Sequence, residues 1–147
     1  MSTIGKRVIY AGPVDGANTK PLHVEGVAVD AMLAGTLLKQ SASGLETSDV
    51  DATVSGQQVL FADKDQMRSR SVDDAWTIDE NMNAISPRSG EFLNVLVATA
   101  QALIVGTPLA SNGDGTLKIA TVATDAVIGH SDEAVTTTAA QLVRVRF

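Results

Sequence analysis

The sequence predicts an all-β fold, a compact sandwich or barrel of short strands of the β-clip or jelly-roll type. Apolar and polar residues alternate with the period of a strand in several segments, as in Leu93–Val97 and Val143–Phe147. Turn-forming residues recur at short intervals, for example Gly12-Pro13, Ser43-Gly44 and Asn112-Gly113. The chain also repeats itself, which indicates two similar copies of one small unit.

The repeat has a constant separation of 71 positions and is read without a gap. It is too long for the unit of a solenoid, so two copies of a compact unit are expected. The nine identities are Leu22, Val24, Ala31, Gly35, Thr36, Leu38, Gly44, Ala52 and Thr53, which recur as Leu93, Val95, Ala102, Gly106, Thr107, Leu109, Gly115, Ala123 and Thr124.

The elements follow from this plan in chain order. Residues 1–21 are an extended N-terminal arm, and residues 22–147 form the β domain, with copy one at 22–78, a polar connector at 79–91 and copy two at 92–147. Each copy is expected to begin with a strand (22–29 or 93–99), bend at a glycine, and continue through a hairpin at Gly44 or Gly115. Strands at 75–78 and 142–145 close the copies, and Phe147 lies on the apolar side of the last one.

Composition limits the partners. The formal net charge of −6 disfavours nucleic-acid binding, which takes most of its affinity from Lys and Arg. The five aromatic residues offer few rings for stacking on bases or sugars. The chain has no cysteine, which excludes disulfides, and no apolar run of the length of a membrane helix, so no membrane partner is expected.

Catalytic patterns are missing, and we expect no enzyme, no cofactor and no metal. His23 and His130 are the two histidines, and neighbours in Gly129-His130-Ser131-Asp132 would point to opposite faces of a strand. The loop 110–115 lacks the first and last ligands of a calcium loop and fits a tight hairpin instead. No phosphate-binding glycine motif occurs.

The glycine bend followed by a hairpin and an apolar strand resembles the decoration, or cement, proteins of tailed-bacteriophage heads. The resemblance is best over residues 90–135, through Gly106-Thr107-Pro108-Leu109 and Ala126-Val127-Ile128-Gly129. It implies a structural virion protein that binds the major capsid protein on the outer capsid surface, commonly as a homotrimer, after synthesis in the host cytoplasm. The duplication departs from the single copy of many such proteins.

The residues expected to contact the capsid or a neighbouring subunit lie mainly in the arm: Ile4, Val8, Ile9 and Tyr10. The alternative is that this segment is an edge strand of the protein's own sheet. Trp76 is a second candidate contact, with packing in the core as its alternative. Phe92 and Phe147 are candidates for an oligomer contact or for burial within one chain.

Two other functions remain open. One is a β-barrel module of a phage fibre or adhesin that binds a carbohydrate or peptide, which would need a polar groove that the sequence does not display. The other is an enzyme or its accessory domain, which would need titratable residues that converge, whereas those of this chain are scattered over loops.

Overall fold

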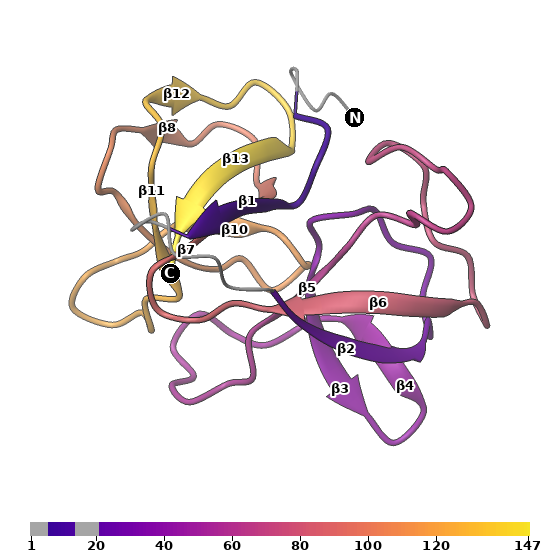
Figure 1. The fold of residues 1–147 in the computed structure, drawn as a ribbon. Coiled ribbons are helices and arrows are strands. Elements are labelled where there is room, and N and C mark those ends of the chain that lie inside the picture. The colour runs from indigo at the N-terminus through magenta and orange to yellow at the C-terminus, as the bar shows by residue number, and fades with distance from the viewer. Residues whose placement is uncertain (1–5, 14–20) are drawn as a thin grey trace.

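Within the residues that the computed structural model describes, 6–13 and 21–147, the chain forms thirteen β-strands and no helix. The all-β fold class is therefore confirmed. Figure 1 shows two groups of strands, one at the upper left formed by β1 and β7 to β13 and one at the lower right formed by β2 to β6. Each group is a small barrel, and we number them barrel one and barrel two in chain order.

Barrel one has five strands in the order β2-β6-β5-β3-β4. Its end strands meet where Ala28 bridges Leu45 in parallel, and the N–H of Val29 donates to the carbonyl of Leu45 at 2.9 Å. Buried side chains such as Leu38 and Leu60 fill its interior. The strands are β2 (Leu22–Val27), β3 (Leu37–Ser41), β4 (Gly44–Thr47), β5 (Leu60–Ala62) and β6 (Asn81–Ser86).

Barrel two repeats this order as β7-β13-β11-β9-β10, and it closes because β10 pairs with β7. The closing contact is again parallel: Leu117 pairs with Val97, and the N–H of Ala98 donates to the carbonyl of Leu117 at 2.8 Å. The strands are β7 (Glu91–Val97), β9 (Pro108–Ser111), β10 (Leu117–Ile119), β11 (Gly129–Ser131) and β13 (Gln141–Arg146), and β8 (Ala102–Leu103) pairs with β12 (Val135–Thr136) beside them.

The repeat is visible in backbone geometry. Gly35 and Gly106 have φ angles of 87° and 92°, values that L-residues rarely adopt, so the same glycine-dependent turn occurs in both copies. The closing contacts place residue 28 of barrel one where residue 97 stands in barrel two, so the first strands are offset by 69 positions rather than 71. A shift of two residues keeps each side chain on the same face of the strand.

The structure corrects the expected end of the first copy. No strand covers residues 75–78, where Trp76 forms a single bridge with Met32. The last strand of barrel one is β6, which lies inside the segment expected to be a connector. Its alternate residues Met82 and Ala84 are buried, so the period-two pattern of a strand is present. The small and amide side chains of this segment led to the expectation of a polar connector.

The described part of the expected N-terminal arm also differs from the expectation. Strand β1 (Tyr10–Pro13) pairs antiparallel with β7, and the N–H of Asn94 donates to the carbonyl of Ile9 at 2.6 Å. The Ile9 side chain is 1% exposed. This part is thus an edge strand of barrel two, as the alternative interpretation had it.

The two barrels share one core. Leu37, Phe61 and Ile85 of barrel one belong to the same buried cluster as Leu93 and Leu142 of barrel two. Backbone hydrogen bonds cross between the barrels, from the N–H of Leu37 to the carbonyl of Gly115 at 2.7 Å and from the N–H of Leu96 to the carbonyl of Gly35 at 2.9 Å. The rigid unit that carries any functional surface is therefore the pair of barrels.

Candidate functional site

The arm residues proposed as contacts are not presented together. Ile4 lies outside the described residues, Ile9 is buried under β7, and Tyr10 is half-buried in β1. Val8 is 46% exposed, while its carbonyl accepts a hydrogen bond from the side-chain amide of Asn94 at 2.8 Å. Of these four, Val8 is thus the described side chain with substantial exposure to a partner.

Trp76 is a buried side chain of barrel one. Its side chain is 3% exposed, and its indole N–H donates to the carbonyl of Asp63 at 2.7 Å. A buried tryptophan usually pairs its N–H in this way, so Trp76 fastens the loop between β5 and β6 to barrel one. Within this chain Trp76 is therefore packed in the core, which is the second of the two interpretations given for it.

Phe92 and Phe147 are half-buried and make contacts within the chain. The rings of Phe147 and Phe61 have centroids 5.3 Å apart, which joins the last residue to the shared core. The guanidinium carbon of Arg144 lies 5.8 Å from the centroid of the Phe92 ring, a cation–π arrangement.

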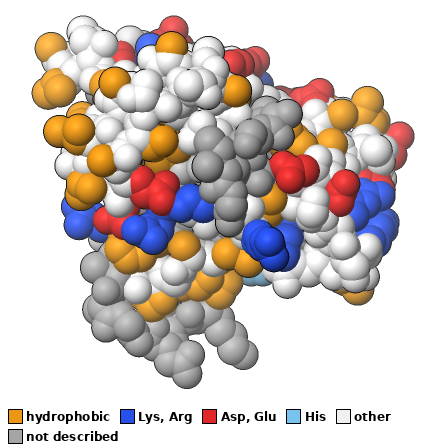
Figure 2. Space-filling model, turned by 90° about the horizontal axis from the view of Figure 1, so that it is seen from above, with side chains coloured by type: hydrophobic (Ala, Val, Ile, Leu, Met, Phe, Trp, Pro, Cys, Tyr) orange, Lys and Arg blue, Asp and Glu red, His pale blue; other side chains and the backbone are white. Residues whose placement is uncertain are grey.

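The charged surface is mixed. On the face shown in Figure 2, acidic and basic side chains are interspersed, with hydrophobic side chains in separate groups between them. Several of these charges are paired, for example Arg144 with Asp132 at 2.7 Å and Lys39 with Asp49 at 2.6 Å. This face therefore carries charges of both signs and not a field of one sign.

Three exposed valines stand out on two loops that touch. The loop after β4 carries Val54, which is 46% exposed, and the loop after β10 carries Val122 and Val127, which are 82% and 44% exposed. These loops occupy equivalent places in the two barrels, and the N–H of Ala126 donates to the carbonyl of Ala52 at 2.7 Å between them (Figure 1). We call Val54, Val122 and Val127 the valine face.

Local hydrogen bonds order both loops of the valine face. The carboxylate of Asp51 accepts from the N–H and the hydroxyl of Thr53, each at 2.9 Å, and these bonds hold the pKa of Asp51 below its ordinary value. The carboxylate of Asp125 accepts from the N–H of Thr121 at 2.9 Å. Side-chain-to-backbone bonds of this kind fix a turn, so the valines are presented by ordered loops.

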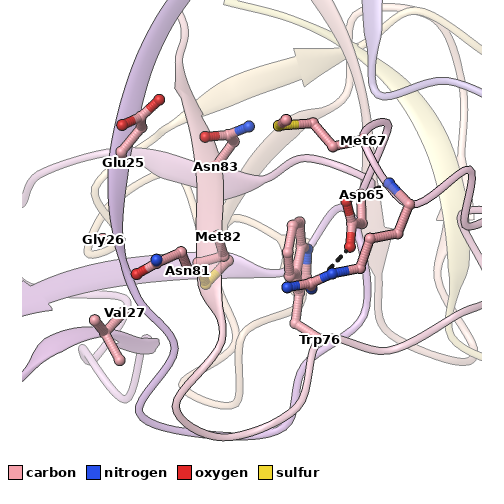
Figure 3. Close-up of a pocket in the computed structure, with 10 residues that line it drawn as sticks. Glu25, Gly26, Val27, Asp65, Met67, Trp76, Asn81, Met82 and Asn83 are labelled. Carbon is pink, nitrogen blue, oxygen red and sulfur yellow. Dashed lines mark hydrogen bonds and ion pairs between the residues drawn. The ribbon is translucent and has the colours of Figure 1, made fainter.

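Barrel one also carries an open cavity of about 660 Å³. Figure 3 shows it between the β2–β6 ribbon, with Glu25, Val27, Asn81 and Asn83, and the loop that bears Met67 and Trp76. Within the described residues, the side chains of Glu25, Asn81 and Asn83 form no hydrogen bond or ion pair. The cavity therefore offers polar groups that a ligand or partner could use.

A charge network holds the outer wall of this cavity. Glu80 accepts from both terminal nitrogens of Arg70 at 2.9 Å and from Arg68 at 3.0 Å. The hydrogen bonds from Arg70 lower the pKa of Glu80 from 4.5 to about 2. Arg68 also bonds the buried carboxylate of Asp65 at 3.1 Å, so the loop is tied at several points.

The described residues hold no group of three or more His, Cys, Asp or Glu side chains that could bind a metal ion. His130 is exposed while its neighbour Ser131 is 1% exposed and donates to the carbonyl of Glu133 at 2.8 Å, so the two side chains face apart. Over the part of the chain that the structure covers, no helix has the length and apolar character needed to cross a membrane.

Sequence reasoning missed both the valine face and the cavity. Val54 and Val122 lie in segments rich in Thr, Ser and Asp, where an isolated valine carries no signal of its own exposure. The signal that was available is that both segments belong to the repeat, next to Ala52-Thr53 and Ala123-Thr124.

Comparison of the chain with protein-family models and with curated proteins found no match.

Proposed function

We propose that this chain is a structural virion protein that binds the outer surface of a phage capsid, contacts the major capsid protein and stabilises the shell. The resemblance of residues 90–135 to head decoration proteins suggested this function. The observation that carries it here is the valine face, because it presents exposed aliphatic side chains on ordered loops of a rigid double barrel.

The physical argument rests on the cost of binding. Ordering a mobile loop at an interface opposes association, whereas loops that are already fixed avoid much of that cost. Burial of a valine contributes at most about 1.5–3 kcal/mol, so three partly exposed valines support a modest contact. A modest contact per chain suffices when several linked chains bind the shell together, because multivalent attachment gains avidity.

The first experiment measures copy number. Particles from the source lysate are separated on a density gradient, and this chain is quantified against the most abundant shell protein by mass spectrometry. A ratio near one per shell subunit supports decoration of the lattice. A few copies per particle would move the protein to a vertex or tail, and its absence from particles would refute the proposal.

A pair of variants then tests which surface binds. We expect Val122→Asp to abolish binding to shells that lack the protein, because it places a charge on the valine face. Val8→Asp is the matched control, since Val8 is exposed at 46% on the segment before β1. If Val8→Asp abolishes binding and Val122→Asp does not, the N-terminal segment is the contact and the valine face is not.

The cavity in barrel one favours the second candidate, a module that binds a carbohydrate or peptide. Its volume of about 660 Å³ is in the range of small-ligand sites, and Glu25, Asn81 and Asn83 offer free polar groups. This function predicts saturable binding of an oligosaccharide or peptide that Asn83→Ala weakens. Screening immobilised glycans with the wild type and this variant tests it.

A further inference from the structure

One turn occurs twice in the fold, once covered and once exposed. We call residues 33–36 the inner turn and residues 104–107 the outer turn. In each, the threonine hydroxyl donates to the carbonyl three residues earlier, at 2.7 Å for Thr36 and 2.8 Å for Thr107. The φ angles of the two glycines agree within 5°. The two turns therefore have the same conformation.

The inner turn and the outer turn differ in solvent exposure. In the inner turn, Ala34 is 1% exposed, and Leu33 packs against the shared core. In the outer turn, Ile104 and Val105 at the same positions are 70% and 64% exposed. The same rigid element thus presents two large aliphatic side chains to solvent in barrel two.

The inner turn is covered because it docks on barrel two. The N–H of Leu96 in β7 donates to the carbonyl of Gly35 at 2.9 Å. A Cβ on Gly35 would lie 2.5 Å from Cδ2 of Leu142, which is the register partner of Leu96 in β13. Leu96 and Leu142 therefore form the surface that receives the turn.

Strand pairing identifies the same surface on barrel one. Residue 28 matches residue 97 at the closing contacts, so the preceding register pair Val27–Asn81 takes the place of Leu96–Leu142. The N–H of Ala28 donates to the carbonyl of Glu80, the residue before β6, at 2.8 Å, so the N–H of Val27 points away from β6. Val27 and Asn81 line the 660 Å³ cavity, where Val27 is 38% exposed.

We propose that the cavity of barrel one receives the outer turn of a second copy of this chain. Ile104 and Val105 enter the cavity, and the carbonyl of Gly106 accepts from the N–H of Val27, as the carbonyl of Gly35 accepts from Leu96. Apolar lining for the two aliphatic side chains comes from Val27, Met67, Trp76 and Met82. The contact inside the chain is the template for the contact between chains.

This contact is head to tail, because each chain carries one outer turn and one cavity. Heterologous contacts of this kind form rings when the rotation between subunits closes. A ring of three chains would contain six barrels joined by six similar contacts, three within chains and three between them. The proposal concerns self-association and does not depend on the proposed capsid function.

The test uses variants of each half of the contact. We expect Ile104→Asp with Val105→Asp, in the turn, and Met67→Asp, in the cavity wall, each to weaken self-association at least about 30-fold, the effect of losing an interface hot spot. Met67 is 93% exposed, so its replacement leaves the fold intact. Mass is measured by light scattering after size exclusion, and the fold by circular dichroism.

A mixture of the two variants gives the decisive result. The turn variant keeps a normal cavity and the cavity variant keeps a normal turn, so equal amounts together form dimers that cannot grow. Val122→Asp is the matched control and retains the wild-type mass, because Val122 lies on the valine face. Loss of shell binding by Val122→Asp with unchanged mass separates the two proposals.

Four outcomes overturn the inference. A wild-type chain that stays monomeric up to millimolar concentration has no such contact. Turn variants that retain the wild-type mass show that another surface joins the subunits. A mixture that does not form dimers shows that the contact is not head to tail, and an oligosaccharide or peptide that fills the cavity of the assembled protein shows that a ligand occupies it instead.

Discussion

Replacement of Gly35 by alanine is expected to destabilise the protein more than the same replacement at Gly106. Both glycines have a positive φ, 87° and 92°, so alanine suffers similar backbone strain at each site, about 1–2 kcal/mol. Gly106 has no heavy atom within 4 Å of an added Cβ. At Gly106 the backbone strain is therefore the whole cost in the single chain.

At Gly35 the new methyl group also collides with barrel two. It would lie 2.5 Å from Cδ2 of Leu142 and 3.3 Å from the backbone nitrogen of Leu96, and the latter cannot rotate away. Overpacking of this kind costs about 1–3 kcal/mol beyond the backbone strain. We expect a total loss of about 2–5 kcal/mol at Gly35 against about 1–2 kcal/mol at Gly106.

Urea unfolding followed by the fluorescence of Trp76 measures both values. In a chain of 147 residues, each kcal/mol corresponds to a shift of about 3 °C in Tm, so thermal unfolding checks the order. The measurements use dilute protein, because self-association would add stability. Equal losses for Gly35→Ala and Gly106→Ala would refute the docking of the inner turn on barrel two.

Three further predictions concern other parts of the fold. Ile9→Ala should cost about 2–5 kcal/mol in urea unfolding, because the side chain is 1% exposed, whereas Val8→Ala should stay within about 0.5 kcal/mol; equal effects would contradict the placement of β1. Trp76→Phe should cost about 1–3 kcal/mol, because it leaves the buried carbonyl of Asp63 unpaired, and wild-type emission at long wavelength would contradict the burial of Trp76. The pKa of Glu80 is lowered from 4.5 to about 2, so its ionised form stabilises the fold above about pH 4.5 and this contribution is lost as the pH falls toward 2; Glu80→Gln should therefore be less stable than the wild type at pH 7 and approach it at pH 2, and a difference independent of pH would contradict this assignment.

The sequence predicted those features that depend on local chemistry. A turn with φ near 90° favours glycine for steric reasons, so Gly35 and Gly106 could be identified as equivalent bends before the fold was known. The same reasoning applies to Gly44 and Gly115, with φ angles of 140° and 87°. Strand alternation in β7 and β13 was equally clear because both strands carry large aliphatic residues at alternate positions.

Features decided by distant partners could not be predicted. Strand β6 contains Asn81, Asn83 and Ser86 and has low intrinsic strand propensity, and it is a strand because it pairs with β2 on one side and β5 on the other. Residues 75–78 have higher propensity but find no such neighbours, apart from the bridge of Trp76 to Met32. Pairing outweighs propensity in both cases.

The candidate surfaces were hidden for the same reason. Val122 and Leu117 lie five residues apart in copy two, yet one is 82% exposed and the other fully buried. Leu117 lies in β10, which pairs with β7 and β9, whereas Val122 lies in the loop that follows β10. Exposure of an aliphatic side chain is a property of the whole fold, so the valine face and the cavity of barrel one required the structure.

The exposed aliphatic side chains of the outer turn contribute little to the stability of their own chain. The conformation of this turn depends on Gly106 and on hydrogen bonds of Thr107, and neither involves the side chains of Ile104 or Val105. Polar residues at these two positions would change the free energy of unfolding of a single chain by no more than about 0.5 kcal/mol, as for other exposed sites. The stabilisation that these aliphatic side chains can provide therefore requires a surface outside their own chain, and the covered inner turn shows what kind of surface the fold supplies.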